Sequence, residues 1–203
     1  GFTWSRQWGV TRNPWNNKFT SGGSSGGSSA SLASGTSTIC TGSDIGGSIR
    51  IPASTCGLVG YKPPYGRNPE EAIFNLDFYC HTGPLARSVK DCIRLQNVMC
   101  GPSPKDIASL RPKLVLPYDY KPIKDWKIAY SPNLGCFEVD PEVERNTLAS
   151  LEVFKSLGAT VEEVDLGWGS EVLEAGLAYL GHIFGGAMED ELKQHADKLT
   201  SYA

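Results

Sequence analysis

The chain is organised around two stretches rich in glycine and serine: residues 20–35, TSGGSSGGSSASLASG, and residues 41–67, TGSDIGGSIRIPASTCGLVGYKPPYGR. We call them the first and second Gly-Ser stretches. By composition alone they would be typical of flexible linkers. However, residues 30–33 carry a short helical pattern, and residues 36–40 (TSTIC) are β-prone. Linkers do not carry apolar runs of this kind, so we predict an ordered core in which glycines let the backbone approach other groups closely.

Ser48 stands in the most informative position of the second Gly-Ser stretch, directly after Gly46 and Gly47. Consecutive glycines let backbone N–H groups turn toward one point and form an anion-binding nest. A nest beside a serine hydroxyl suits acyl transfer, because the hydroxyl attacks a carbonyl while the N–H groups receive the oxyanion. The first stretch places further hydroxyls between glycines at residues 22–27, where one can relay a proton if a base lies behind it. The pattern therefore indicates a serine nucleophile.

Two other chemistries are disfavoured because their motifs are missing. His81, His182 and His195 lie in no recognisable catalytic motif, and the sequence has no Gly-x-Ser-x-Gly elbow. Glycine-rich loops also bind phosphates, but the sequence has no Gly-Lys-Ser or Gly-Lys-Thr. We interpret the histidines as ordinary surface or core residues and expect no nucleotide.

Helix and strand signals continue beyond the Gly-Ser stretches. A helix is predicted to begin at Ser88, where Asp91 completes a capping box, and to end at Gly101. Residues 126–166 predict a βαβ unit whose helix is capped by Asp140. Apolar residues lie along one side of that second helix: Val143, Leu148, Leu151, Phe154 and Leu157.

The alternation of strands and helices predicts an α/β fold class. A βαβ unit favours a mixed, partly parallel β-sheet covered by helices. The tail from about residue 170 has a helical pattern. With 203 residues the chain can form one well-buried domain, so we expect a single domain over residues 1–203.

Composition and charge exclude several partner classes. The net charge is −3 and the basic residues form no run, so nucleic acid is not an expected partner. No apolar segment approaches a membrane span, and the first residues lack a signal-peptide layout. The six cysteines show no zinc-finger spacing and are interpreted as reduced, mostly buried thiols, which favours a cytoplasmic location.

Taken together, the two Gly-Ser stretches closely resemble the signature of the amidase-signature family. Residues 8–16, WGVTRNPWN, are similar to the segment that leads into this signature, and residues 82–91, TGPLARSVKD, to the segment that follows it. The βαβ unit also suits the family, so the resemblance covers essentially the whole chain. It implies an amidase-signature fold, incomplete at both ends, with residues 21–60 as the signature core.

The resemblance implies a role for individual residues. Ser48 matches the family's nucleophile, which the amide carbonyl acylates. Ser24 matches the bridging serine, held across a cis peptide bond, which relays protons between the nucleophile and a lysine. The matching oxyanion-hole N–H groups are those of Ile45, Gly46, Gly47 and Ser48. The matching polar positions that brace the loop are Ser25, Asp44 and Arg50.

The family's catalytic lysine has no counterpart in the sequence. It belongs to a segment that would precede Gly1. Lys18 falls in a stretch that matches a non-catalytic segment, and Lys62 matches a lysine that is not the base. We therefore expect a fragment that is inactive in isolation and whose base comes from elsewhere, such as the remaining part of the same enzyme as a separate chain.

The leading hypothesis is an amide-bond hydrolase that acts on a small-molecule amide through a Ser48 acyl-enzyme, with no metal or organic cofactor. The first alternative is the glutaminase subunit of a tRNA-dependent amidotransferase, from a subfamily that tends to carry Thr at position 45 and Gln at position 51. Ile45 and Ile51 favour a stand-alone amidase. The second alternative is a catalytically incomplete scaffold or binding chain.

Overall fold

The computed structural model describes residues 2–200, which divide into two compact units. The first unit comprises the residues up to Tyr118 together with those from Ala187 onward, and the second comprises Asp119–Gly186. The single domain expected from the sequence stays a prediction; the boundary between the two compact units lies after Tyr118. Each unit is described by itself.

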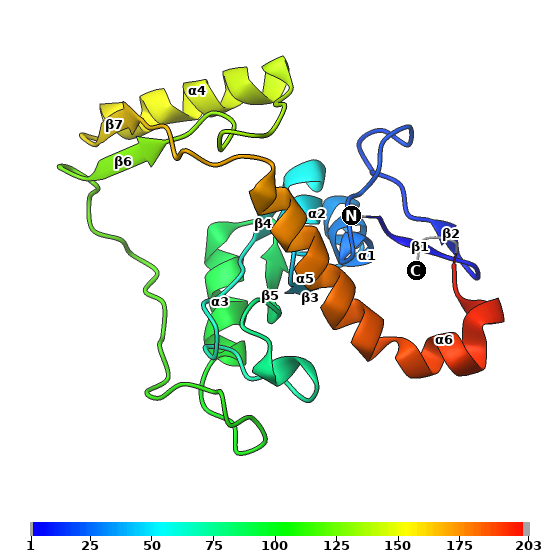
Figure 1. The fold of residues 1–203 in the computed structure, drawn as a ribbon. Helices are drawn as coiled ribbons and strands as arrows, with labels where there is room; N and C mark the ends of the chain where they lie inside the picture. The colour runs from blue at the N-terminus through cyan, green and yellow to red at the C-terminus, as the bar shows by residue number, and fades with distance from the viewer. Residues whose placement is uncertain (1, 201–203) are drawn as a thin grey trace. The chain divides into compact units, whose positions relative to one another are not determined.

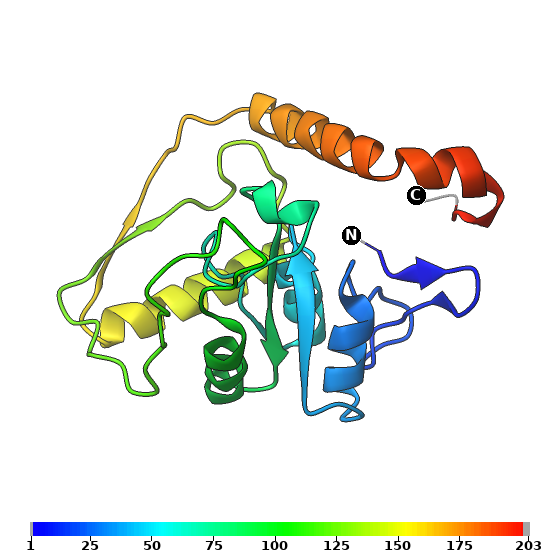
Figure 2. The same cartoon turned by 90° about the horizontal axis from the view of Figure 1, so that it is seen from below.

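The centre of the first unit is a three-stranded antiparallel sheet with the strand order β3-β5-β4. Figure 2 shows its two long strands, β3 (Ile39–Asp44) and β5 (His81–Ala86), side by side. The short strand β4 (Val59–Gly60) pairs with the other edge of β5. In the register of β3 and β5, Asp44 lies opposite His81, so the last residue of β3 meets the first residue of β5.

Each Gly-Ser stretch leads directly into a helix that packs near this sheet. The first forms α1 (Gly26–Ala33) and the second forms α2 (Arg50–Cys56). The prediction of an ordered core is confirmed, since these segments supply most of the buried cluster. That cluster consists of Leu32, Ile49, Ala53 and Leu85, with Cys40 and Leu58 packed against it.

The helix predicted from Ser88 is α3 (Val89–Met99). Ser88 Oγ accepts a hydrogen bond from the Asp91 N–H at 3.2 Å, as a helix cap does. The same hydroxyl donates to the Asp91 carboxylate at 2.7 Å, so the two side chains bind each other instead of forming the reciprocal backbone bond of a capping box. Further short elements of this unit are β1 (Trp4–Ser5), β2 (Gly9–Val10), η1 (Phe74–Leu76), α6 (Glu189–His195) and η2 (Ala196–Lys198).

The second unit contains the predicted βαβ arrangement. Strands β6 (Lys127–Tyr130) and β7 (Thr160–Glu163) pair in parallel, and α4 (Pro141–Ser156) connects them and lies along the pair in Figure 1. Asp140 caps α4, because its carboxylate accepts the N–H of Glu142 at 2.7 Å. The helical tail is α5 (Glu171–Ala187), followed by α6.

The α/β class and the mixture of parallel and antiparallel pairing are confirmed. Within residues 2–200 the strands form separate sheets of two, three and two strands, and β6 and β7 make up the parallel pair. No residue of α4 is buried, and four members of its predicted apolar side are exposed: Val143, Leu148, Phe154 and Leu157.

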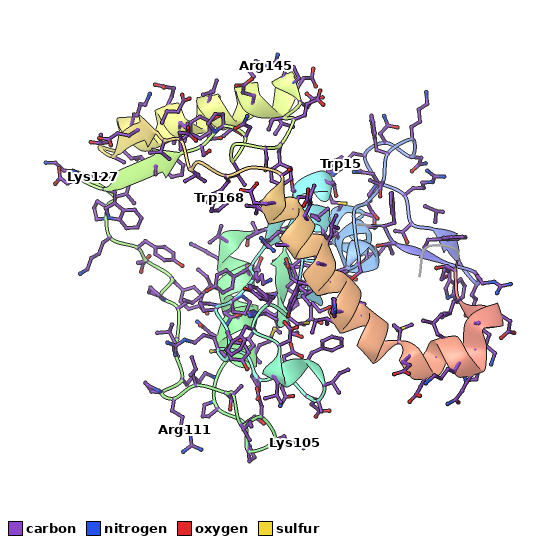
Figure 3. The ribbon with its side chains drawn as sticks, viewed as in Figure 1. Trp15, Lys105, Arg111, Lys127, Arg145 and Trp168 are labelled. Atoms are coloured by element: carbon purple, nitrogen blue, oxygen red, sulfur yellow. The ribbon has the colours of Figure 1, made fainter. Side chains whose placement is uncertain are left out.

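The cysteines of both units and one tryptophan of the first unit complete the description. All six cysteines of the chain are free; Cys56, Cys92 and Cys100 are buried and the other three are half-buried. Trp15, labelled in Figure 3, is 73% exposed, yet its indole N–H donates to the carbonyl of Cys56 at the end of α2 at 2.9 Å. This contact ties the segment before the first Gly-Ser stretch to the second.

Candidate active site

Ser48 lies in a tight loop between the end of β3 and the start of α2, and its side chain is half-buried. Gly47 has a φ of +124°, a conformation that L side chains rarely adopt. A Cβ at Gly47 would stand 2.6 Å from Cδ1 of Ile51. The backbone conformation therefore requires glycine immediately before Ser48, and a larger residue would also make the Ile51 side chain shift.

The carboxylate of Asp44 holds this loop in place through hydrogen bonds. It is fully buried, and its Oδ1 accepts from Gly47 N–H at 2.7 Å, from Arg50 Nη2 at 2.9 Å and from Lys62 Nζ at 3.2 Å. Its Oδ2 accepts from the N–H groups of Ile49 and Arg50, each at 3.2 Å, and from Arg50 Nε at 2.9 Å. One side chain thus fixes the backbone on both sides of Ser48.

The charge of Asp44 is stabilised although the group is buried. Burial alone would raise the pKa of Asp44, but the hydrogen bonds from Arg50 and Gly47 and the positive charge of Lys62 hold it well below its ordinary value. The hydrogen bond to Asp44 in turn raises the pKa of Arg50. Asp44 is therefore ionised near neutral pH, and the loop is organised around a satisfied buried charge.

Ser24 lies in a turn of the first Gly-Ser stretch that has no room for larger residues. The Gly23–Ser24 peptide bond is cis, as the resemblance implies. Gly22 has a φ of +73°, and a Cβ there would stand 2.9 Å from Cα of Pro52. A Cβ at Gly23 would overlap the backbone of Phe2. The Ser24 side chain itself is exposed.

The structure brings the two Gly-Ser stretches together. Ser25 N–H donates to the carbonyl oxygen of Ser48 at 3.2 Å, and Ser25 Oγ donates to the carbonyl oxygen of Ser43 at 3.4 Å. Between residues 2 and 200, neither the Ser24 nor the Ser48 hydroxyl has a hydrogen-bonding partner. Both hydroxyls are therefore available to a substrate or to each other.

The four N–H groups expected in the oxyanion hole are not equivalent. The Gly47 N–H already donates to Asp44, so an oxyanion would have to compete with a carboxylate for it. The N–H groups of Ile45, Gly46 and Ser48 have no acceptor in the described part of the chain. The sequence does not predict this difference among the four N–H groups, because it depends on the orientation of the Asp44 side chain.

Neither lysine near the site is placed as a base. The Lys62 ammonium donates to Asp44 and, at 3.1 Å, to the carbonyl oxygen of Ile45. Lys18 is exposed. Within residues 2–200, no lysine ammonium is hydrogen-bonded to the hydroxyl of Ser24 or Ser48.

His81 is the residue near the site that the sequence motifs did not single out. It is 7% exposed, and its Nε2 lies 3.0 Å from the carbonyl oxygen of Phe78, so the ring proton is assigned to Nε2. Its Nδ1 is buried without a partner in the described chain. Burial and then the positive charge of Lys62 lower the pKa of His81. Only the strand register, which places His81 opposite Asp44, reveals its proximity to the Ser48 loop.

Metal-binding clusters and membrane-spanning helices are both absent from residues 2–200. In that range, no group of three or more His, Cys, Asp or Glu side chains is arranged to hold a metal ion. No helix there combines the length and the apolar character that crossing a bilayer requires.

The family of the chain follows from comparison with known proteins. A family profile described as Amidase matches residues 2–198, so the chain belongs to the amidase family. An acylamidase of Rhodococcus erythropolis is 37% identical over 173 residues, which cover 84% of this chain and 36% of that protein. A glutamyl-tRNA(Gln) amidotransferase subunit of Synechococcus sp. (strain WH7803) is 39% identical over 176 residues, covering 81% and 34%.

Solved structures agree with this assignment. A bacterial aryl acylamidase described as belonging to the amidase signature enzymes superimposes with a TM-score of 0.89 at 33% identity, covering all of this chain and 44% of that one. The corresponding glutamyl-tRNA(Gln) amidotransferase subunit of Thermotoga maritima gives a TM-score of 0.70 at 31% identity and covers 79% of this chain and 36% of that one. The chain spans about a third of the length of the curated relatives, since it covers 36% and 34% of them.

Proposed function

We propose that the protein carrying these 203 residues hydrolyses amide bonds through an acyl-enzyme on Ser48. The observation that carries the proposal is the construction of the Ser48 loop. A buried, fully hydrogen-bonded Asp44 holds a serine whose hydroxyl is unpartnered in the described chain, next to backbone N–H groups that lack acceptors there. A nucleophile beside preorganised donors is the arrangement that acyl transfer requires.

In the proposed reaction, Ser48 Oγ attacks the amide carbonyl carbon and its proton passes to the Ser24 hydroxyl, which hands a proton on to a base. The carbonyl oxygen becomes an oxyanion bound by the free N–H groups of Ile45, Gly46 and Ser48. When the intermediate collapses, the carbon–nitrogen bond breaks and the leaving amine takes a proton from the relay. Water then attacks the Ser48 ester by the same route, releasing the acid and restoring the hydroxyl. Each oxyanion donor is worth about 10²–10³ in kcat.

We assign the base to a lysine outside these 203 residues. The Lys62 ammonium donates to Asp44 and to the carbonyl oxygen of Ile45. Lys18 is exposed, and its ammonium makes no contact with Ser24. The relatives are about three times as long as the matched region, which leaves room for such a residue. In isolation, the chain would then act as a scaffold without turnover.

A glutaminase subunit is the second candidate, because the amidotransferase relatives are as similar in sequence as the acylamidase. Two observations favour a stand-alone amidase. Ile stands at positions 45 and 51, and the structural likeness to the aryl acylamidase is greater and covers the whole chain. A cytoplasmic location is also proposed, supported by the six free cysteines.

The test is labelling with a fluorophosphonate serine probe, mapped by peptide mass spectrometry, on the 203-residue chain and on the protein at its natural length. We expect Ser48 to be labelled at natural length and the label to be lost in Ser48→Ala. Label on another serine, or none at natural length, would overturn the proposal. Release of amine from acyl anilides would support the amidase, and release of ammonia only from glutamine would support the glutaminase subunit.

A further inference from the structure

Lys62 makes a contact that bracing Asp44 does not explain. Its ammonium lies 3.1 Å from the carbonyl oxygen of Ile45, in addition to 3.2 Å from Asp44 Oδ1, and its side chain is only 17% exposed. The backbone on either side is fixed, because Tyr61 N–H donates to the carbonyl of Pro84 and Pro63 is fully buried. The lysine is therefore held against the loop, and its stem is largely removed from water.

The carbonyl that Lys62 binds belongs to the peptide unit between Ile45 and Gly46. This peptide bond is not among the cis bonds of the described chain, so its C=O and N–H point in opposite directions. An ammonium on the Ile45 oxygen therefore fixes the direction of the Gly46 N–H, which points the opposite way within the peptide plane. Hydrogen bonding at the oxygen also polarises the peptide and makes that N–H a stronger donor.

Asp44 cannot perform this task. Its bonds to the loop go to the N–H groups of Gly47, Ile49 and Arg50, which follow the peptide in question. Among residues 2–200, the Lys62 bond is the only hydrogen bond to either polar group of the Ile45–Gly46 peptide. Because Gly46 tolerates either orientation of that peptide, the unit would be free to rotate without the lysine.

We propose that Lys62 is a positioning residue for the oxyanion hole: it orients and polarises the Gly46 N–H through the carbonyl oxygen of Ile45. The inference rests on the proposed function, since it assigns a task within the Ser48 site. Lys62 touches neither the substrate nor the reacting atoms, and it takes no proton.

The test compares Lys62→Met, which keeps the length of the side chain but removes its charge and donors, with Lys62→Arg, which keeps both. Lys90→Met, on the exposed face of α3, is the matched control. The protein at natural length is assayed for the rate of fluorophosphonate labelling at Ser48 and for kcat and KM with an acyl anilide. We expect Lys62→Met to lower the labelling rate and kcat about 10- to 100-fold, as for a weakened oxyanion donor, with KM nearly unchanged. Lys62→Arg should recover part of the loss and Lys90→Met should match the wild type.

A spectroscopic readout separates positioning from a merely structural role. The carbonyl stretching frequency of the Ser48 acyl-enzyme, measured by isotope-edited infrared difference, reports how strongly the oxyanion hole polarises the ester. We expect this frequency to rise in folded Lys62→Met toward that of the denatured acyl-enzyme. If Lys62→Met does not fold, Lys62→Gln is measured in its place, and its carbonyl frequency is also expected to rise.

The outcomes distinguish the inference from the function on which it rests. If the wild type is labelled at Ser48 and a folded Lys62→Met or Lys62→Gln variant matches it in rate and carbonyl frequency, the inference is wrong and the proposed function stands. If the wild type is not labelled at Ser48 at all, the proposed function is wrong and the inference falls with it.

Discussion

The N–H of Ser25 donates to the carbonyl oxygen of Ser48 at 3.2 Å and joins the two Gly-Ser stretches beside both proposed catalytic serines. Since this bond is made by the backbone, it depends on the path of the chain and not on the Ser25 side chain. Ser24, the proposed relay residue, is thereby placed one residue from a direct backbone contact with Ser48, the proposed nucleophile. This contact joins the two stretches without using the hydroxyl of either serine.

Ser25→Ala is expected to leave this anchor intact. The variant loses only the 3.4 Å bond from Ser25 Oγ to the carbonyl of Ser43, a long bond worth about 0.5–1 kcal/mol. Fluorophosphonate labelling of Ser48 should therefore stay within about threefold of the wild type, and the free energy of unfolding should fall by no more than that amount. A loss of labelling comparable to Ser24→Ala would show that the Ser25 hydroxyl takes part in the relay.

Asp44→Asn is expected to loosen the Ser48 loop. The amide lacks the negative charge that Arg50 and Lys62 neutralise, and its nitrogen cannot accept the bonds from the loop N–H groups. Because the Arg50 side chain is half in solvent, we expect a cost of about 2–3 kcal/mol in the free energy of unfolding, less than for a wholly buried pair. Urea unfolding measures this cost, and labelling of Ser48 should drop with it.

Asp91→Asn is the matched control for that substitution. The Asp91 carboxylate also accepts a hydrogen bond near a helix start and pairs with an arginine, but its side chain is 39% exposed. We expect a smaller cost in the free energy of unfolding than for Asp44→Asn, and no change in labelling. An equal effect of the two substitutions would argue against a special role for the buried charge.

Local sequence signals predicted the helices and strands. The arrangement of the candidate site, in contrast, depends on contacts between residues that are distant in sequence. Ser88 and Asp140 mark their helix starts because a cap depends only on the next few residues. The approach of Lys62 to Ile45 and the pairing of Asp44 with His81 could not be predicted, since both depend on the register of β3 and β5. Physical patterning alone indicated Ser48 as the nucleophile but offered several candidate relay hydroxyls at residues 22–27, among which the family resemblance selected Ser24.

The exposure of the apolar side of α4 also could not be predicted from the sequence. The apolar pattern along α4 predicts a buried face, because apolar periodicity indicates that a helix face needs a partner but does not identify one. In the structure, Val143 and Leu157 are each 56% exposed. The same limit applies to Gly47, because only the three-dimensional structure shows that its N–H donates to Asp44.

Stability should fall on the acid side of neutrality because of His81. Its pKa is lowered in the folded protein, by burial first and by Lys62 second, although Asp44 and Asp77 oppose the shift. The unfolded chain therefore binds the proton first, near the ordinary value of 6.5. The contribution of neutral His81 to the free energy of unfolding should be fully present above this pH. It should be lost as the pH falls through 6.5 toward the pKa of His81 in the folded protein.

Urea unfolding of His81→Gln between pH 4.5 and 8 measures this contribution. We expect the variant to lose the decline in the free energy of unfolding that begins as the pH falls through 6.5. His182→Gln is the control, because His182 is exposed on α5. A slope that survives in His81→Gln would assign the acid sensitivity to another group.

Two glycine-to-alanine substitutions, one expected to destabilise the protein and one to stabilise it, test how tightly the backbone of the Ser48 loop is constrained. At Gly47, the φ of +124° and the 2.6 Å approach to Ile51 both oppose a Cβ, so we expect Gly47→Ala to cost about 1–3 kcal/mol and to abolish most labelling of Ser48. At Gly27, within α1, a Cβ would meet nothing within 4 Å, and alanine should stabilise by about 0.5–1 kcal/mol with labelling unchanged. Thermal unfolding and the fluorophosphonate rate, measured on both variants, check the pair. Near-normal labelling in Gly47→Ala would mean that the loop relaxes around the extra carbon, and the backbone at Ser48 would then not be as tightly prescribed as its hydrogen bonds imply.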